Sequence, residues 1–497
     1  MVLGWTKHGD GKHLAPGEVV RPDERLSWPR MVGFGAQHVI AMFGATFVFP
    51  LVMGLDPNIA VMMSGVATIL FLLIVKGRVP SYLGTSASFV GGVLAVRAVA
   101  GGDTAGADAV VTGAILVAGF VLALAGVAIH FLGVQVIHRI FPPVVTGAVV
   151  MLIGFGLAYV VAGVYWPQDH WVALLTMVIT FLVIVLFKGF VGRIGVLVGL
   201  VAGFVLSWVL DRLAGPITSV LPSANLRDAA GNPCTAEGTY CVATAFPHDR
   251  VSFDKVAKAE WFGLPDFHGP DFRFSAVLLV LPAVIALIAE NVGHVKAVGE
   301  MTGADVDPYV GRAVAADGVA TVVASAVGGS PTTTYAENIG VMAATKVYST
   351  AAYYIAAVIA ILFGLCPKFG QLVAATPGGV LGGVTVILYG MIGLLGAKIW
   401  IENRVSFADP VNMVPIGAGI ILAIGPVHHP VAGEFTLEGI ALGTIVVLGG
   451  YHLLRAISGR PLEPAARAGS TAGNPAGSTA GNPTGSPTGS TTGSEAG

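Results

Sequence analysis

The stretch "TTTYAENIGVMAATKV", residues 332–347, places a glutamate and an asparagine in a segment that is otherwise typical of a membrane span. It follows the small polar run "GGSP", so the span opens with residues that a lipid-facing helix would not favour. A second acid lies in "ALIAENVGHVKAVGE", residues 286–300, where Glu290 is again followed by an asparagine. Ionisable groups inside a membrane are costly, and they usually mark a substrate or ion pathway. These two segments therefore predict a membrane transport site.

Composition supports a membrane protein. The 497 residues are 55% hydrophobic and 11% charged, with a mean hydropathy of +0.80, whereas a soluble domain is about 25% charged. The 26 Lys and Arg with 28 Asp and Glu could not cover so large an apolar core in water. The net charge of −2 offers no basic surface for nucleic acid.

Apolar runs of about 20 residues, the length of one helical crossing, predict an all-α polytopic fold with about 14 spans. They fall near 32–52, 57–75, 80–100, 109–133, 141–164, 168–187, 194–213, 274–298, 311–328, 334–347, 349–370, 377–397, 408–427 and 435–456. The third and tenth spans are interrupted by Gly, Ser and Thr at "PSYLGTSASFVGG" and "GGSPTTTYAENIG". Interrupted spans at equivalent places in two halves indicate a binding cavity near the membrane midplane.

Basic residues in alternate short loops predict that both termini are cytoplasmic. Lys76, Lys188 and Arg312 lie in loops of this set. The opposite side then carries a polar insert with Cys234 and Cys241, which can pair if that side is oxidising. The tail from about residue 461 is a small polar repeat and is predicted to be disordered.

Weak internal similarity suggests two inverted halves of seven spans. "PPVVTGAVVMLIG", residues 142–154, parallels "PGGVLGGVTVILYG", residues 377–390, and "GTSASF" in span three parallels "PTTTYAE" in span ten. An odd number of spans per half gives the halves opposite orientations. The alternative is that glycine-rich helices resemble one another by chance.

The intramembrane polar groups suggest the ligand. Glu290 and His294 are four residues apart and share a helix face, and Glu337 stands at the break in span ten, with Asn291 and Asn338 following the two acids. Carboxylates accept hydrogen bonds and free backbone N–H groups donate them, which suits a neutral planar molecule that alternates N–H and C=O. An anion such as sulfate or bicarbonate is disfavoured. A Glu–His pair that only ties helices together is the structural alternative.

The sequence indicates the roles of the other polar residues less specifically. Histidine titrates near neutrality, so protons are the expected coupling ion. A sodium site is the alternative. No cofactor is expected. In span one, Gln37 and His38 are supporting candidates, with a packing role for His38 equally open. Asp317 is interpreted as a structural link near the site. His428 and His429 lie in an outer turn, and no metal site is predicted there.

These segments resemble the nucleobase-ascorbate transporter family, most closely its bacterial uracil permease branch. The family signature reads here "ENIGVMAATK", Glu337 to Lys346, in full. "AQHVIAMFGATFVFP", "VPSYLGTSASF" and "AENVGH" resemble the permease segments in order and spacing. The resemblance covers roughly residues 28–458.

The resemblance implies a core and a gate, with short antiparallel strands of spans three and ten meeting at the substrate. The implied divisions are 1–30, a cytoplasmic N-terminus; 31–135, core; 136–214, gate; 215–273, an extracellular insert; 274–372, core; 373–458, gate; and 459–497, a disordered tail. It also implies that Glu290 and Glu337 bind the nucleobase and that His294 supports binding or proton coupling. The implied pocket is completed by backbone near Ala87, Phe89 and Ala336, with Tyr389 approaching from the gate.

The expected function is therefore proton-coupled uptake of uracil across a bacterial plasma membrane, with a homodimer suggested by resemblance alone. Glu at the head of the signature favours uracil over xanthine. The chain departs from the branch at Ala87, where an aromatic is common, and at Ala336, where Gly is common. A xanthine or broad nucleobase symporter, or less favourably an anion exchanger, remains as an alternative, while an intramembrane enzyme lacks a motif.

Overall fold

The computed structural model describes residues 4–15, 18–100, 105–133, 139–219, 245–425, 427–432 and 435–459. The predicted pairing of Cys234 with Cys241 and the predicted disorder of the tail lie outside these residues. The described chain is mostly helical, with a few strands of two to five residues.

Every predicted span corresponds to a helix, or to a strand that leads into a helix. The first half contains α1 (Trp28–Met53), α2 (Pro57–Ile74), β3 (Leu83–Thr85) with α3 (Val90–Ala100), α4 (Ala105–Leu132), α6 (Pro143–Gly156), α8 (His170–Leu186) and α10 (Gly195–Ala214). The second half contains α12 (Phe274–Val280) with α13 (Pro282–Thr302), α14 (Asp307–Ser325), β6 (Thr332–Thr334) with α15 (Ala336–Thr345), α16 (Thr350–Gly364), α18 (Gly378–Glu402), α19 (Pro410–Ile424) and α20 (Gly439–Ser458).

Several of these segments are shorter than a full crossing. Among the described residues, eight helices are long and apolar enough to span a membrane, or nine if α16 and α17 (Pro367–Ala374), which meet at a bend of 82°, count as one. The predicted spans that do not reach this length include the strand–helix segments of spans three and ten. Irregular backbone of this kind is tolerated at membrane depth where protein or a wet cavity surrounds it. The interruptions read from the sequence are confirmed.

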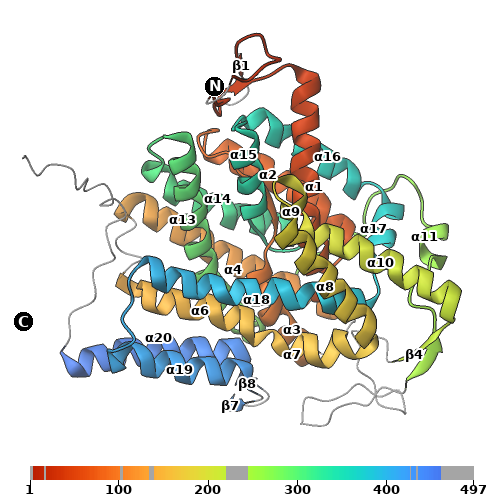
Figure 1. Cartoon of the computed structure of the whole chain (residues 1–497). Coiled ribbons are helices and arrows are strands. Elements are labelled where there is room, and N and C mark those ends of the chain that lie inside the picture. Colours follow the sequence, from red (N-terminus) through yellow and green to blue (C-terminus); the bar gives the residue numbers. More distant parts are fainter. Residues whose placement is uncertain are drawn as a thin grey trace, which may run out of the picture.

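The helices pack in two groups (Figure 1). In the first, α14 packs on α4 and α2, and α16 packs on α1 and α2. In the second, α18 packs on α6 and α8, α19 packs on α20 and α6, and α10 packs on α8. We name them the core group and the gate group. The residue limits of the core and gate domains stay a prediction.

Glycines allow the closest helix contacts inside each group. A Cβ added at Gly126 of α4 would lie 2.1 Å from the Ala315 nitrogen of α14, and one added at Gly154 of α6 would lie 2.1 Å from the Gly393 nitrogen of α18. Membrane helices associate through van der Waals packing of such small residues, because lipid provides little hydrophobic drive between them. The glycine-rich composition is thus used for packing in both groups.

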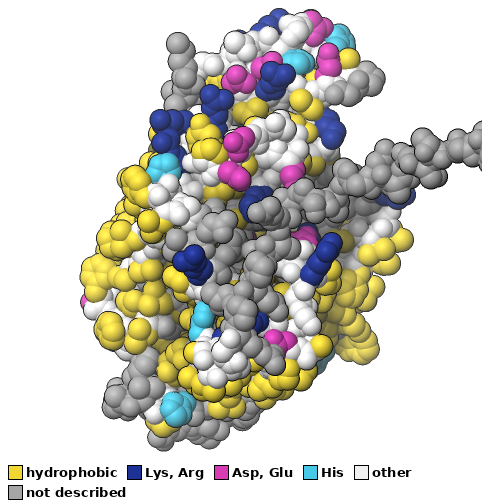
Figure 2. Space-filling model, turned by 90° about the vertical axis from the view of Figure 1, so that its left-hand side faces the viewer, with side chains coloured by type: hydrophobic (Ala, Val, Ile, Leu, Met, Phe, Trp, Pro, Cys, Tyr) yellow, Lys and Arg dark blue, Asp and Glu magenta, His cyan; other side chains and the backbone are white. Residues whose placement is uncertain are grey.

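The outer surface is apolar where lipid would contact it. Figure 2 shows a broad hydrophobic area, with charged side chains concentrated toward the upper end of the view. On α4, Phe120, Leu124 and Phe131 expose 55%, 53% and 79% of their surface. Large exposed apolar areas of this kind mark contact with a membrane or a partner, and with the helix lengths they identify a multi-pass membrane protein.

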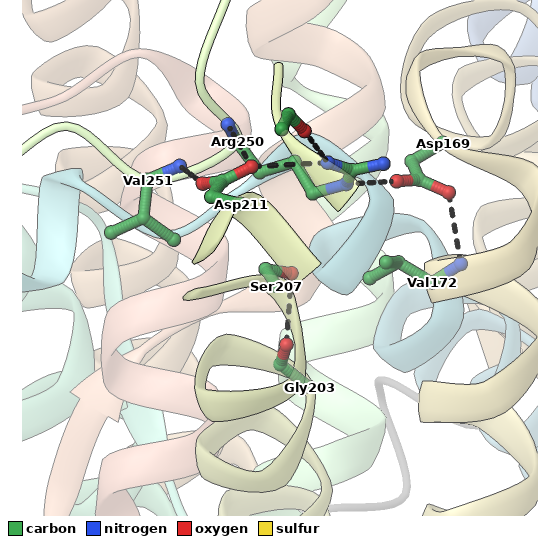
Figure 3. A network of polar contacts seen from close by, with 8 residues as sticks. Asp169, Val172, Gly203, Ser207, Asp211, Arg250 and Val251 are labelled. Atoms are coloured by element: carbon green, nitrogen blue, oxygen red, sulfur yellow. Dashed lines mark hydrogen bonds and ion pairs between the residues drawn. The ribbon is translucent and has the colours of Figure 1, made fainter. Parts of the chain in front are cut away.

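An arginine ties the part of the insert after residue 244 to the gate group (Figure 3). The guanidinium of Arg250 donates to Asp169 Oδ2 at 2.7 Å, to Asp211 Oδ1 at 3.0 Å and to the Gly215 carbonyl at 3.1 Å. The backbone N–H of Val251 donates to the other Asp211 oxygen at 2.9 Å. Asp169 precedes α8 and Asp211 lies in the last turn of α10, so one cation joins both helices.

We expect Arg250→Gln to lower the apparent unfolding temperature of the protein in detergent. The Asp169 and Asp211 side chains are 9% and 10% exposed, and removing the partner of nearly buried carboxylates costs about 3 kcal/mol. Arg273→Gln is the matched control, because Arg273 is 56% exposed beside Asp271 and such pairs contribute less than about 1 kcal/mol. Equal unfolding temperatures for the two variants would contradict this role.

Candidate functional site

The two interrupted spans meet through their strands. β3 pairs antiparallel with β6, with Leu83 opposite Thr334, Gly84 opposite Thr333 and Thr85 opposite Thr332. Two further backbone bonds extend the pairing, from Tyr335 N to Tyr82 O at 3.0 Å and from Ser86 N to Pro331 O at 2.8 Å. A helix begins one residue after each strand: η1 (Ala87–Phe89), which leads into α3, and α15. The predicted meeting of short strands is confirmed, and it brings both helix starts to one place.

A tyrosine fills the space beside the strand pair. The Tyr335 hydroxyl donates to the Thr85 carbonyl at 2.8 Å and accepts from Thr46 Oγ1 of α1 at 3.1 Å. A Cβ added at Gly84 would lie 2.5 Å from Tyr335 Cζ and 2.6 Å from Thr46 Oγ1. Gly84 is therefore required by close approach.

We expect Gly84→Ala to destabilise the protein by about 1–3 kcal/mol, because the new methyl group overpacks this buried contact. The unfolding temperature in detergent should fall. Gly33→Ala on α1 is the matched control, since no atom lies within 4 Å of the added Cβ. An unchanged unfolding temperature for Gly84→Ala would show that Tyr335 moves aside at little cost.

The structure brings the two predicted acids together. Glu290 lies on α13 and Glu337 lies in the first turn of α15; α13 packs against α15, β6 and η1. The two carboxyl groups are close enough to interact electrostatically. His294 is one turn from Glu290, and its Nδ1 lies 2.8 Å from Thr334 Oγ1 of β6. One cluster thus contains two carboxyl groups and an imidazole at the end of the strand pair.

The residues of this cluster keep part of their surface exposed. Glu290, His294, Glu337 and Ala87 are half-buried, and Ala336 is exposed. The residues that follow the two acids are fully buried. The two acids are therefore less buried than the asparagines beside them.

Phe89 and Tyr389 lie deeper than their predicted roles suggest. The Phe89 side chain is 0% exposed, so a ligand at that position would contact the backbone and not the ring. Tyr389 is on α18 of the gate group and is 3% exposed. Its hydroxyl has no hydrogen-bond partner among the described residues, and its electrostatic neighbours are Tyr165 and Tyr159, not the acids. The approach of Tyr389 to a ligand stays a prediction.

The supporting residues form two buried pairs. Asn291 donates a hydrogen bond to Asp317 Oδ2, and Asp317 also interacts electrostatically with Glu290. Asn338 Nδ2 donates to the His38 carbonyl at 2.9 Å and lies 3.1 Å from His38 Nδ1.

Within the described residues, the side-chain carbonyl oxygens of Asn291 and Asn338 and one Asp317 oxygen lack partners. The His38 ring stacks on Tyr353 of α16 with centroids 4.3 Å apart. Gln37 is half-buried beside it. Each asparagine therefore holds the helix turn that carries an acid. Separately, the described residues contain no group of three or more His, Cys, Asp or Glu suited to a metal.

A family model described as "Permease family", of the xanthine and uracil permeases, matches residues 30–432. The chain belongs to the nucleobase-ascorbate transporter family. As a permease of this family it is a transporter and not an enzyme.

Relatives of this permease match over most of their length. It is 42% identical over 446 residues to a protein of Escherichia coli (strain K12) named "Putative pyrimidine permease RutG", covering 89% of this chain and 93% of the relative. It is 34% identical to the uracil permease of Bacillus caldolyticus, covering 88% and 94%, and 32% identical to that of Bacillus subtilis (strain 168), covering 85% and 91%.

Two solved structures share the fold of the permease. The transmembrane domain of the cyanobacterial bicarbonate transporter BicA matches with a TM-score of 0.54 at 12% identity, covering 86% of this chain and 100% of that domain. The murine anion transporter Slc26a9, in its inward-facing state, matches with a TM-score of 0.59 at 13% identity, covering 87% and 69%. The inverted-repeat architecture with core and gate groups is therefore shown.

Two threonines that the sequence did not mark as site residues contact the strand pair. Thr68 of α2 and Thr321 of α14 each bond to the backbone of a strand. Both end the tetrapeptide "GVAT", residues 65–68 and 318–321, which stands in the second span of each half. That identity adds to the similarities that suggested the internal repeat.

Proposed function

We propose that this permease carries uracil into the cell, coupled to protons, by alternating movement of the core group against the gate group. The observation that supports this most directly is that the half-buried Glu290 and Glu337 carboxyl groups lie together beside the strand pair. Carboxylates accept from ring N–H groups, and the first N–H groups of α15, which have no side-chain cap, would donate to ring carbonyls. Uracil alternates these two kinds of group around one ring.

The relatives favour a pyrimidine over an anion. Those with 32–42% identity are named for uracil or pyrimidine, whereas the bicarbonate and anion transporters resemble this chain in fold at 12–13% identity. Two neighbouring carboxyl groups would also repel an anion. Xanthine or a wider set of nucleobases is the second candidate, because Ala87 and Ala336 have small side chains and are not buried.

Proton coupling is proposed from the same cluster. Glu290, Glu337 and His294 are half-buried titratable groups inside a membrane protein, and such groups form proton relays in transporters. We also propose that the protein lies in a bacterial plasma membrane with both termini cytoplasmic, on the basis of the basic loops. A dimer through gate helices is proposed from family resemblance alone.

The test is uptake of labelled uracil into cells that lack their own uracil permease, with and without excess unlabelled xanthine. Saturable uptake that xanthine does not reduce supports a uracil carrier. Blockade by xanthine would replace it with a broader nucleobase carrier. Uptake equal to that of cells without the protein would contradict the proposed substrate.

A further inference from the structure

Two buried hydroxyl groups hold the strand pair from opposite helices. Thr68 and Thr321 are both 0% exposed, on α2 and α14, the second helix of each half. Thr321 Oγ1 accepts from the Thr332 N–H at 3.1 Å and lies 3.2 Å from the Thr332 carbonyl. Thr68 Oγ1 accepts from the Leu83 N–H at 2.9 Å, and it lies 2.8 Å from the Ser64 carbonyl of its own helix and 3.4 Å from the Leu83 carbonyl. Each hydroxyl thus accepts a hydrogen bond from the N–H of the first residue of one strand.

The strand pair needs such partners. A sheet of two three-residue strands has an outer edge on each side, where N–H and C=O groups point away from the ladder. Leu83 and Thr332 are 0% and 2% exposed, so water does not satisfy their backbone groups, and each buried group without a partner costs about 1–3 kcal/mol. Because the pair is antiparallel, Leu83 lies opposite Thr334 and Thr332 lies opposite Thr85. The two threonines therefore hold opposite ends of the pair.

Movement of the strands would be transmitted to the acids. Thr334, the last residue of β6, bonds to His294, and only Tyr335 separates β6 from the helix that begins with Ala336 and Glu337. On the other strand, only Ser86 separates β3 from η1. The positions of both helix starts are thus set by the strand ends that the two hydroxyl groups hold.

We propose that Thr68 and Thr321 are positioning residues for the transport site: their hydroxyl groups fix the strand pair in the geometry that binds substrate. The proposal rests on the proposed function for its substrate, uracil, but not for the contact itself. Neither threonine is among the predicted site residues. The requirement is for the hydroxyl and not for the shape of the side chain, so valine and serine should behave oppositely.

The experiment compares Thr68→Val and Thr321→Val with Thr68→Ser and Thr321→Ser in the full chain. Valine keeps the volume and removes the acceptor of the strand N–H, so each valine variant should raise the KM for uracil uptake about tenfold. The maximal rate per molecule in the membrane should change much less. The serine variants keep the hydroxyl and should stay within about threefold of wild type.

The matched control is Thr112→Val. Thr112 is a buried threonine of α4 whose hydroxyl lies 2.9 Å from the Asp108 carbonyl and 3.2 Å from the Ala109 carbonyl of its own helix. This variant should leave the KM unchanged. An equal rise of KM in Thr112→Val would show that loss of any buried hydroxyl is enough, and it would overturn the proposal.

Amide hydrogen exchange of the purified protein separates this proposal from the choice of substrate. Without uracil, Thr321→Val should speed exchange in a peptide covering residues 331–336, and Thr68→Val should do so in one covering 82–87. Unchanged exchange in both would overturn the proposed contacts, and faster exchange with an unchanged KM would overturn the positioning role. If wild type takes up no uracil, the substrate proposal fails while the exchange result still decides whether the hydroxyl groups hold the strands.

Discussion

Replacing Glu337 with glutamine is expected to abolish specific uracil uptake. The amide keeps the shape but turns one oxygen acceptor into an N–H donor, which would face the N–H edge of the ring. A hydrogen bond to a charged group contributes about 1.5–3 kcal/mol, so kcat/KM should fall about 100-fold. Glu337 is half-buried in the first turn of α15, so its substitution changes the proposed site without disturbing a packed core.

The measurement is the initial rate of labelled uracil uptake, normalised to the amount of protein in the membrane. Glu300→Gln is the matched control, because Glu300 is an exposed acid on α13 and is not part of the cluster. Its kinetics should equal those of wild type. Wild-type kinetics for Glu337→Gln would remove this residue from the proposed site.

Glu290→Ala is the second change with a large expected effect, and it should also abolish uptake. Truncation removes one of the two interacting carboxyl groups and leaves Asp317 without its electrostatic neighbour. If Glu290 has both proposed roles, a proton-binding group and a ligand acceptor are lost together, so neither accumulation nor exchange of uracil should remain. The expected loss is again about 100-fold in kcat/KM.

Binding of uracil to the purified variant, followed by calorimetry, distinguishes the two roles. No measurable binding is expected if Glu290 accepts a hydrogen bond from the ring. Normal binding with no accumulation would restrict Glu290 to proton coupling. Normal binding with normal accumulation would contradict both roles.

Much of the fold was predictable because the membrane imposes it. Apolar runs of fixed length placed the segments in order, and the polar openings of spans three and ten marked the strands that the structure pairs as β3 and β6. The membrane requires every backbone group to be satisfied, so a polar interruption there is a strong signal. The grouping of Glu290, His294 and Glu337 also followed from helix spacing and from the break in span ten.

The remaining features depend on packing that local sequence does not specify. The sequence does not say that the Phe89 side chain turns inward or that Tyr389 lies beside Tyr165. The sequence predicts one continuous span over 349–370, because the apolar run continues through it. In the structure α16 and α17 meet there at a bend of 82°. Thr68 and Thr321 could have been found, since the repeated "GVAT" was visible, but their partners become known only when the strands are placed.

The most direct test of the central claim is uptake of labelled uracil into proteoliposomes that contain only this protein. With the interior made alkaline relative to the outside and sodium absent, uracil should accumulate transiently above its external concentration, and a protonophore should abolish the accumulation. Equilibration without accumulation, or accumulation that requires a sodium gradient, would contradict proton-coupled uracil transport.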